Sequence, residues 1–169
     1  MRKILSIITF ACAVTFALSA CNKSEQPQPA AAEQKPVVLA APTNPADKVA
    51  WKQYLVSVVT ANLQGVKSNH PYIYFVPGGT DDVATTDRSH QLENVTNIVQ
   101  RGVLPGNMMA FGGPDSAITA QLVTDAFKEV QPSAFKDVVV LFIGAQTDAG
   151  RVKQALESSA ADFRFVEAK

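Results

Sequence analysis

YFVPGGTD (residues 74–81), AFGGPD (110–115) and LFIGAQTD (141–148) follow one common pattern. Each begins as an apolar run, breaks at glycine, reaches an aspartate and leads into a helical pattern. The three aspartates lie about 33 residues apart, which is the length of one strand-plus-helix unit. Glycine allows a sharp exit from a strand, and aspartate caps the free N–H groups of the helix that follows. The pattern therefore predicts an α/β domain.

Strand and helix patterns alternate on both sides of these stretches. Strands are expected at residues 72–76, about 107–111, 138–143 and 163–166. A first helix is expected from an N-cap at Asn44 to near Gly65, and others at about 89–101, from 115 or 116 to 130, and from 148 onward. Residues 77–88 carry no apolar period and are expected to form a loop. Such alternation calls for a parallel sheet with right-handed crossovers.

The order of the strands is inferred from their polarity. Residues 138–143 are apolar at every position and residues 72–76 nearly so, which is typical of central strands covered on both faces. Residues 163–166 alternate between apolar and polar, which indicates an edge. The expected order is 2-1-3-4, which resembles a small flavodoxin-like or Rossmann-like sheet with the first helix as an addition. A thioredoxin-like fold would need an antiparallel hairpin, and no two-residue turn separates two strand patterns.

The N-terminus carries a targeting signal. Arg2 and Lys3 precede an apolar run over residues 4–18, which is too short for a comfortable membrane span. The run ends in Leu-Ser-Ala-Cys at 18–21, which resembles the lipobox of bacterial lipoproteins. The resemblance implies cleavage before Cys21 and attachment of lipid to its thiol, with an ordinary secretory signal as the alternative.

Three regions follow from this division of the chain. Residues 1–20 are expected to be the signal peptide, residues 21–43 the lipidated cysteine with a Pro/Gln/Ala-rich tether, and residues 44–169 a single α/β domain. The expected location is the periplasmic face of a bacterial membrane. Asn22 favours the outer membrane under the common sorting rule, whereas Lys-Ser at 23–24 favours the inner membrane in some systems, so the membrane stays open.

Cysteine count and charge exclude several function classes. Cys12 leaves with the signal and Cys21 takes the lipid, so the remaining domain has no thiol for a disulfide, a nucleophile or a zinc site. Without Arg2 and Lys3, 13 basic residues stand against 15 acidic ones. This weak balance, without any Lys/Arg-rich stretch, argues against a nucleic-acid partner.

The best candidate site lies at the strand ends. In open parallel sheets, ligands bind where the strand order reverses, which for order 2-1-3-4 falls between strands one and three. The residues expected to face each other there are Gly78, Gly79, Thr80, Asp81, Asp82, Gly144, Gln146, Thr147 and Asp148. They would suit a small ligand or a divalent cation, but they are ordinary as turn formers and helix caps, which is the interpretation we favour, with Asp148 as an N-cap. No phosphate-binding motif is present, and no cofactor or bound metal is expected.

Catalysis is not the favoured interpretation. Ser116 lacks the glycine two residues later that a nucleophile elbow requires. His70 and His90 are the only histidines, and a Ser/His/Asp trio that joins His90 and Asp87 would make a weak hydrolase. The features that remain favour a non-catalytic, lipid-anchored accessory or interaction module of the cell envelope that docks onto or neutralises a protein partner. The alternatives are a small-ligand or metal-binding module and the weak hydrolase.

Overall fold

Four parallel strands form one sheet in residues 36–169, which are the residues described by this computed structural model. The strands are β1 (Tyr72–Phe75), β2 (Met108–Gly112), β3 (Val139–Gly144) and β4 (Asp162–Glu167). The predicted α/β class with a four-stranded, all-parallel sheet is confirmed. The expected signal peptide, Cys21 and residues 22–35 of the expected tether lie outside the described residues.

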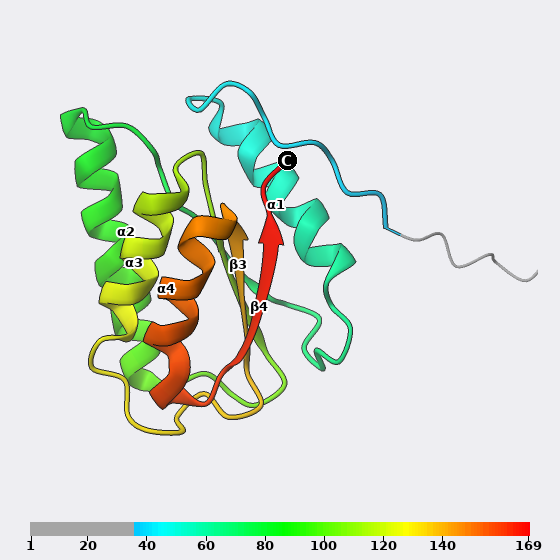
Figure 1. Cartoon of the computed structure of the whole chain (residues 1–169), viewed down its shortest axis with the longest axis vertical. Coiled ribbons are helices and arrows are strands. Elements are labelled where there is room, and N and C mark those ends of the chain that lie inside the picture. The colour runs from blue at the N-terminus through cyan, green and yellow to red at the C-terminus, as the bar shows by residue number, and fades with distance from the viewer. Residues whose placement is uncertain (1–35) are drawn as a thin grey trace, which may run out of the picture. The chain divides into compact units, whose positions relative to one another are not determined.

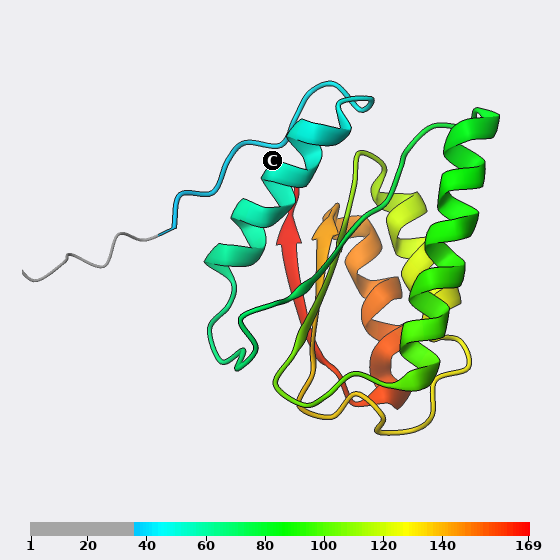
Figure 2. The same cartoon turned by 180° about the vertical axis from the view of Figure 1, so that it is seen from behind.

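Helices cover both faces of the sheet. The bounds are α1 (Lys48–Ala61), α2 (Asp82–Arg101), α3 (Ser116–Phe127) and α4 (Gln146–Leu156), with a short 3₁₀ turn η1 (Glu157–Ser159) after α4. Figures 1 and 2 show α2, α3 and α4 side by side on one face, with α1 alone on the other. None of the helices within residues 36–169 has the length and apolarity needed to cross a bilayer.

The strand order is β1-β2-β3-β4, so the predicted order 2-1-3-4 is wrong. β2, predicted as an edge, is buried at all five positions, whereas β1 lies at an edge. Polarity was a poor guide because β1, although it lies at an edge, has α1 on one face and α2 on the other. Its residues are therefore as apolar as those of a central strand. The predicted edge position of β4 is confirmed.

Two apolar clusters hold the three layers together. On the α1 side, Trp51, Tyr54, Leu55, Val58 and Val59 pack on inward side chains of β2 and β3. On the other side, the larger cluster joins α2, α3 and α4 to the opposite sheet face, and it includes Phe111, Phe127 and Phe142. Each fully buried apolar side chain contributes about 1.5–3 kcal/mol, so the domain needs both layers.

Three helices begin away from their predicted positions, and α4, expected from residue 148, begins at Gln146. Asp47, not Asn44, caps α1 by accepting a hydrogen bond from the Ala50 N–H at 2.9 Å. Helix α2 begins at Asp82 rather than near Ser89, so most of the expected loop is helical. Its first two turns carry no apolar period because they extend past the core, and their side chains lie exposed or half-buried.

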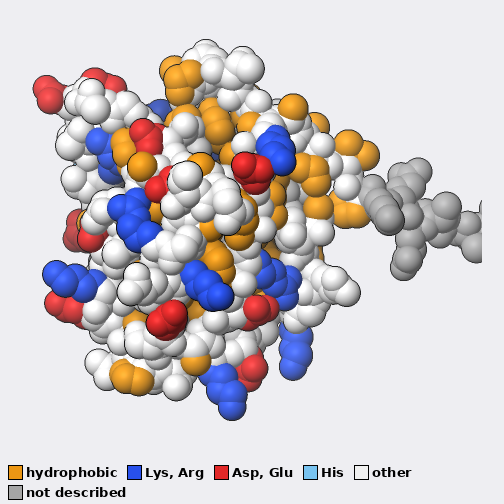
Figure 3. Space-filling model, in the orientation of Figure 1, with side chains coloured by type: hydrophobic (Ala, Val, Ile, Leu, Met, Phe, Trp, Pro, Cys, Tyr) orange, Lys and Arg blue, Asp and Glu red, His pale blue; other side chains and the backbone are white. Residues whose placement is uncertain are grey.

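The segment before α1 is attached to the domain. The Leu39 N–H donates to Ser57 Oγ at 3.1 Å, and the Ala41 N–H donates to the Lys169 carbonyl at the end of the chain. The last part of the expected tether, residues 39–41, is therefore held on the domain, although Leu39 is still 47% exposed. Val37 is 81% exposed, and Figure 3 shows apolar side chains gathered where this segment meets the domain.

Candidate functional site

The two glycine-rich strand ends predicted to form a site do not face each other. Residues 78–82 follow β1 and residues 144–148 follow β3, and β2 lies between these strands. Because consecutive strands are neighbours throughout, the order never reverses, and the switch point on which the prediction rested does not exist.

The residues after β1 form a helix start. Asp81 is the N-cap of α2 and accepts from the Ala84 N–H at 2.9 Å, a bond that lowers the pKa of this exposed carboxyl. Gly79 has a φ of 89°, a conformation that favours glycine, and its carbonyl accepts from Arg88 Nη1 at 2.7 Å. Gly78 packs against Pro114, and Thr80 and Asp82 are exposed. Local structure thus explains this glycine-aspartate run.

The residues after β3 are held by a serine from α3. The Ser116 hydroxyl donates to Asp148 Oδ2 at 2.6 Å, and the Ala145 N–H donates to Ser116 Oγ at 2.7 Å. The prediction that Asp148 caps α4 is wrong, because Ala145 occupies the N-cap position and Asp148 lies within the first turn of the helix. A Cβ added to Gly144 would lie 2.6 Å from Ser116 Oγ, so close packing explains this glycine. Gln146 and Thr147 are exposed in the first turn of α4.

Neither a metal centre nor a catalytic trio is assembled in the described part of the chain. Residues 36–169 contain no cluster of three or more His, Cys, Asp or Glu side chains suited to a metal ion. Ser116 is paired with Asp148 on the α3/α4 side. His90 and Asp87 line a groove beside β1 instead. The imagined Ser/His/Asp trio is therefore not brought together.

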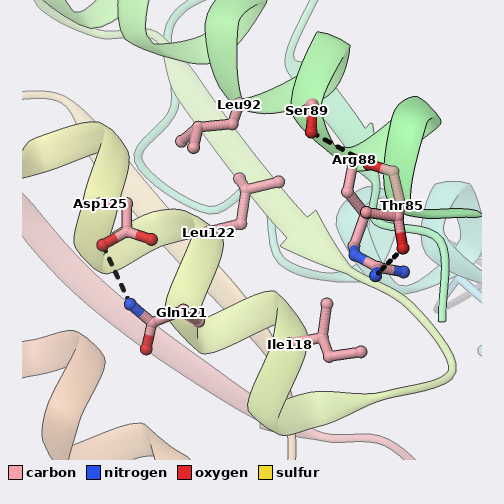
Figure 4. A pocket seen from close by; sticks show the side chains of 8 residues that line it. All are labelled: Thr85, Arg88, Ser89, Leu92, Ile118, Gln121, Leu122 and Asp125. Atoms are coloured by element: carbon pink, nitrogen blue, oxygen red, sulfur yellow. Dashed lines mark hydrogen bonds between the residues drawn. The ribbon is translucent and has the colours of Figure 1, made fainter. Parts of the chain in front are cut away.

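A small groove runs between α2 and α3 (Figure 4). Its volume is about 260 Å³, with an apolar floor made by Leu92, Ile118 and Leu122. Of its polar residues, Arg88 is bonded to Gly79 and Thr85, and Gln121 donates to Asp125 at 2.9 Å. These side chains are satisfied by the protein itself, so the groove offers apolar surface and little directed polarity.

A larger and more polar groove of about 510 Å³ follows the outer edge of β1. Lys48 and Lys52 of α1 form one wall, and polar residues of α2 form the other. The α2 wall consists of Asp87, His90, Gln91 and Asn94. Sequence reasoning considered Asp87 for a cation site or catalysis and His90 for catalysis, and it missed the rest. The spacing of 87, 90, 91 and 94 puts them on one helix face, but only the position of β1 shows what that face borders.

The floor of this groove is the unpaired edge of β1. The Val76 N–H donates to the Gly112 carbonyl at 2.8 Å, so alternate residues Tyr74 and Tyr72 also turn their backbone groups toward β2. The N–H and C=O groups of Ile73 and Phe75 then point away from the sheet. Two donors and two acceptors are thus free for another strand, bounded by Pro71 and Pro77.

The opposite edge is defended against such pairing. β4 carries Asp162, Arg164 and Glu167, and charged side chains discourage the addition of a strand. Arg164 also donates to the Asn62 and Gln64 carbonyls at 2.9 and 2.8 Å, which ties this edge to the end of α1. The four residues of β1 carry no charge at all. The two edges therefore differ in their capacity to accept a strand.

Tyr74 lies under the α2 wall of the groove. Its ring stacks on Phe111 with centroids 4.9 Å apart, and its buried hydroxyl has no hydrogen-bond partner within the described residues. Burial raises the pKa of Tyr74 to about 12, with a smaller contribution from Tyr72. The side chain therefore stays neutral at physiological pH and acts as packing.

Comparison of the chain with family models, with curated proteins and with solved structures found no match in any of the three.

Proposed function

We propose that the protein is a lipid-anchored, non-catalytic accessory module of the cell envelope that docks onto, or neutralises, a protein partner. The docking site in this proposal is the β1 edge, where an extended segment of the partner adds a fifth strand to the sheet. The observation that carries it is the uncharged, unpaired edge of β1 at the floor of a polar groove.

The position of the N-terminal segment supports this assignment. Residues 39–41 are bonded to α1 and to the chain end that follows β4, whereas the groove follows β1. These are opposite edges of the sheet, about 14 Å apart for four strands. A tether that leaves beside β4 keeps the β1 groove free for a partner.

Backbone pairing alone gives weak binding. Four hydrogen bonds from Ile73 and Phe75, each worth about 0.5–1.5 kcal/mol net, amount to about 2–6 kcal/mol. The middle of this range corresponds to a dissociation constant of about 1 mM, before the cost of ordering the partner is subtracted. Contacts with the two helix walls must therefore supply the remaining affinity and the specificity.

Strand addition is tested by first capturing the partner and then measuring amide hydrogen exchange in the complex. A photo-crosslinking residue at Gln91, inside the groove, should capture the partner in cells, and the same residue at exposed Gln154 of α4 should not. The partner captured in this way should then slow amide exchange at Ile73 and Phe75, which point outward. Partner binding that leaves these two amides unprotected would refute strand addition.

A matched pair of variants separates pairing from packing. Ile73→Pro removes one outward N–H and leaves the ladder to β2 intact, because that N–H does not point toward β2. Ile73→Val keeps the N–H and most of the side chain. Crosslinking at Gln91 should fall in the first variant and persist in the second, with melting temperatures measured for both.

The anchor has its own test. Cys21→Ser should leave the signal uncleaved by the lipoprotein peptidase and remove the acyl group. Processed, acylated protein in that variant would refute the lipobox interpretation, whatever the outcome at β1.

A further inference from the structure

We propose that the segment received by β1 is acidic at alternate positions, with the pattern Asp/Glu-x-Asp/Glu, and that its two carboxylates bind Lys48 and Lys52. This inference rests on the proposed function and names the chemistry of the partner at the same site. It is carried by the wall that α1 forms over the β1 edge.

The spacing of the two lysines matches an extended strand. Lys48 and Lys52 are one helical turn apart, which places them about 6 Å apart along α1. Side chains on one face of a strand recur about every 6.8 Å. Lys48 borders Phe75 and Pro77, so it lies near the C-terminal end of β1. Lys52 lies one turn further along α1 and lines the same groove as Ile73 and Tyr74.

The α2 wall suits the residue between the two acids. A strand paired with β1 turns alternate side chains toward α1 and toward α2. Gln91 and Asn94 offer amide donors and acceptors there, beside His90. A polar, uncharged side chain such as threonine fits this wall without burying a charge. The acids therefore belong on the α1 side alone.

One lysine is already engaged across the groove. Lys48 Nζ lies 2.8 Å from Asp87 Oδ2, and both side chains are substantially exposed at 54% and 40%. Lys52 has no ion pair within residues 36–169. An incoming carboxylate thus meets Lys52 unopposed but competes with Asp87 for Lys48. Removing the Asp87 charge should strengthen binding of an acidic segment, an effect that simple damage to the groove would not produce.

Charge argues against a second copy as the occupant. Two copies joined through antiparallel β1 edges would bring the two α1 helices together, because the edges are related by a two-fold axis. Lys48 and Lys52 of one copy would then border the same lysines of the other. Like charges at such a seam disfavour association, whereas an acidic segment complements it.

Three labelled peptides test the inference on the full chain in detergent micelles. Their sequences are acetyl-Thr-Thr-X-Thr-X-Thr-Thr-amide with X as Glu, Gln or Lys, and fluorescence anisotropy measures their affinities at low salt. The Glu peptide should bind about fivefold more tightly than the Gln peptide, as two exposed ion pairs allow, and the Lys peptide most weakly. Lys52→Gln should remove much of this preference, whereas Asp87→Asn should increase it.

The outcomes are distinct. Equal affinity of the Glu and Gln peptides, with both slowing exchange at the Ile73 and Phe75 amides, would overturn the acidic pattern and leave strand addition intact. Absence of peptide binding at millimolar concentration would overturn the pattern too, and partner protection of the same amides then decides the proposed function. Slower exchange of the Ile73 and Phe75 amides at higher protein concentration, without peptide, would identify a second copy as the occupant and refute the inference.

Discussion

Replacing Val140 with aspartate tests the central position of β3 most severely. Val140 is fully buried between Met109 of β2 and Phe163 of β4. Loss of the buried valine costs about 1.5–3 kcal/mol. A fully buried carboxyl group has its pKa raised by about 3–5 units, to about 7 or above, so at 1.36 kcal/mol per unit between pH 3.9 and pH 7 this adds about 4 kcal/mol at neutral pH. The sum rivals the whole stability of a typical domain.

The pH dependence identifies the charge as the cause. Below the unfolded pKa of about 3.9 the new carboxyl is protonated in both states, so its charge costs nothing there. As pH rises from that value to the raised folded pKa, the Val140→Asp protein should lose stability relative to Val140→Asn, which cannot ionise. Urea titrations of both variants from pH 4 to pH 7 measure the difference. Equal stability at pH 7, or melting within a few degrees of the wild type, would refute the buried central placement.

Three further results are expected. Gly113→Ala should lower the free energy of unfolding in urea by about 1–3 kcal/mol or more, because the added Cβ would lie 2.0 Å from a backbone oxygen. Gly150→Ala, on the exposed surface of a helix, should instead raise it by about 0.5–1 kcal/mol. Similar values for the two variants would contradict the packing at Gly113. Ser116→Ala and Asp148→Ala should each cost about 1–2 kcal/mol and the double variant less than the sum, so strict additivity would argue against their bond. The raised pKa of Tyr74, about 12, should make stability fall as pH rises from about 10 toward 12, and Tyr74→Phe should fall less steeply. A parallel fall in that variant would assign the effect elsewhere.

The sequence was sufficient for the elements of the sheet but not for their order. Glycine at the end of each of the first three apolar runs predicted the three crossover units. Order failed at β1 and β2 because mean apolarity does not separate a central strand from an edge strand enclosed by two helices. β2 joins large apolar residues to Gly112 at its end, and close packing of α1 explains this glycine. A Cβ at Gly112 would lie 2.5 Å from Leu55 Cδ2.

The candidate site depended on that order and changed with it. Asp81 was correctly interpreted as compatible with a cap, because the signal is local. Asp148 was not, since its partner Ser116 lies 32 residues away and only the packing of α3 against α4 brings them together. Lys52 could not be identified either, because a lysine on a helix acquires meaning only from the strand edge beside it.

The hydrogen bond between the Ala41 N–H and the Lys169 carbonyl makes the domain almost a closed ring. A short linker from residue 169 to residue 41 would complete the ring, and the chain could then be opened elsewhere. The loop between α3 and β3 is a natural opening, since residues 131–134 are exposed. A circular permutant that begins there would start with β3 and end with α3, yet it would retain every strand neighbour. A tether joined to the new N-terminus would then leave the domain at the N-terminal ends of the strands, and the β1 groove would be unchanged.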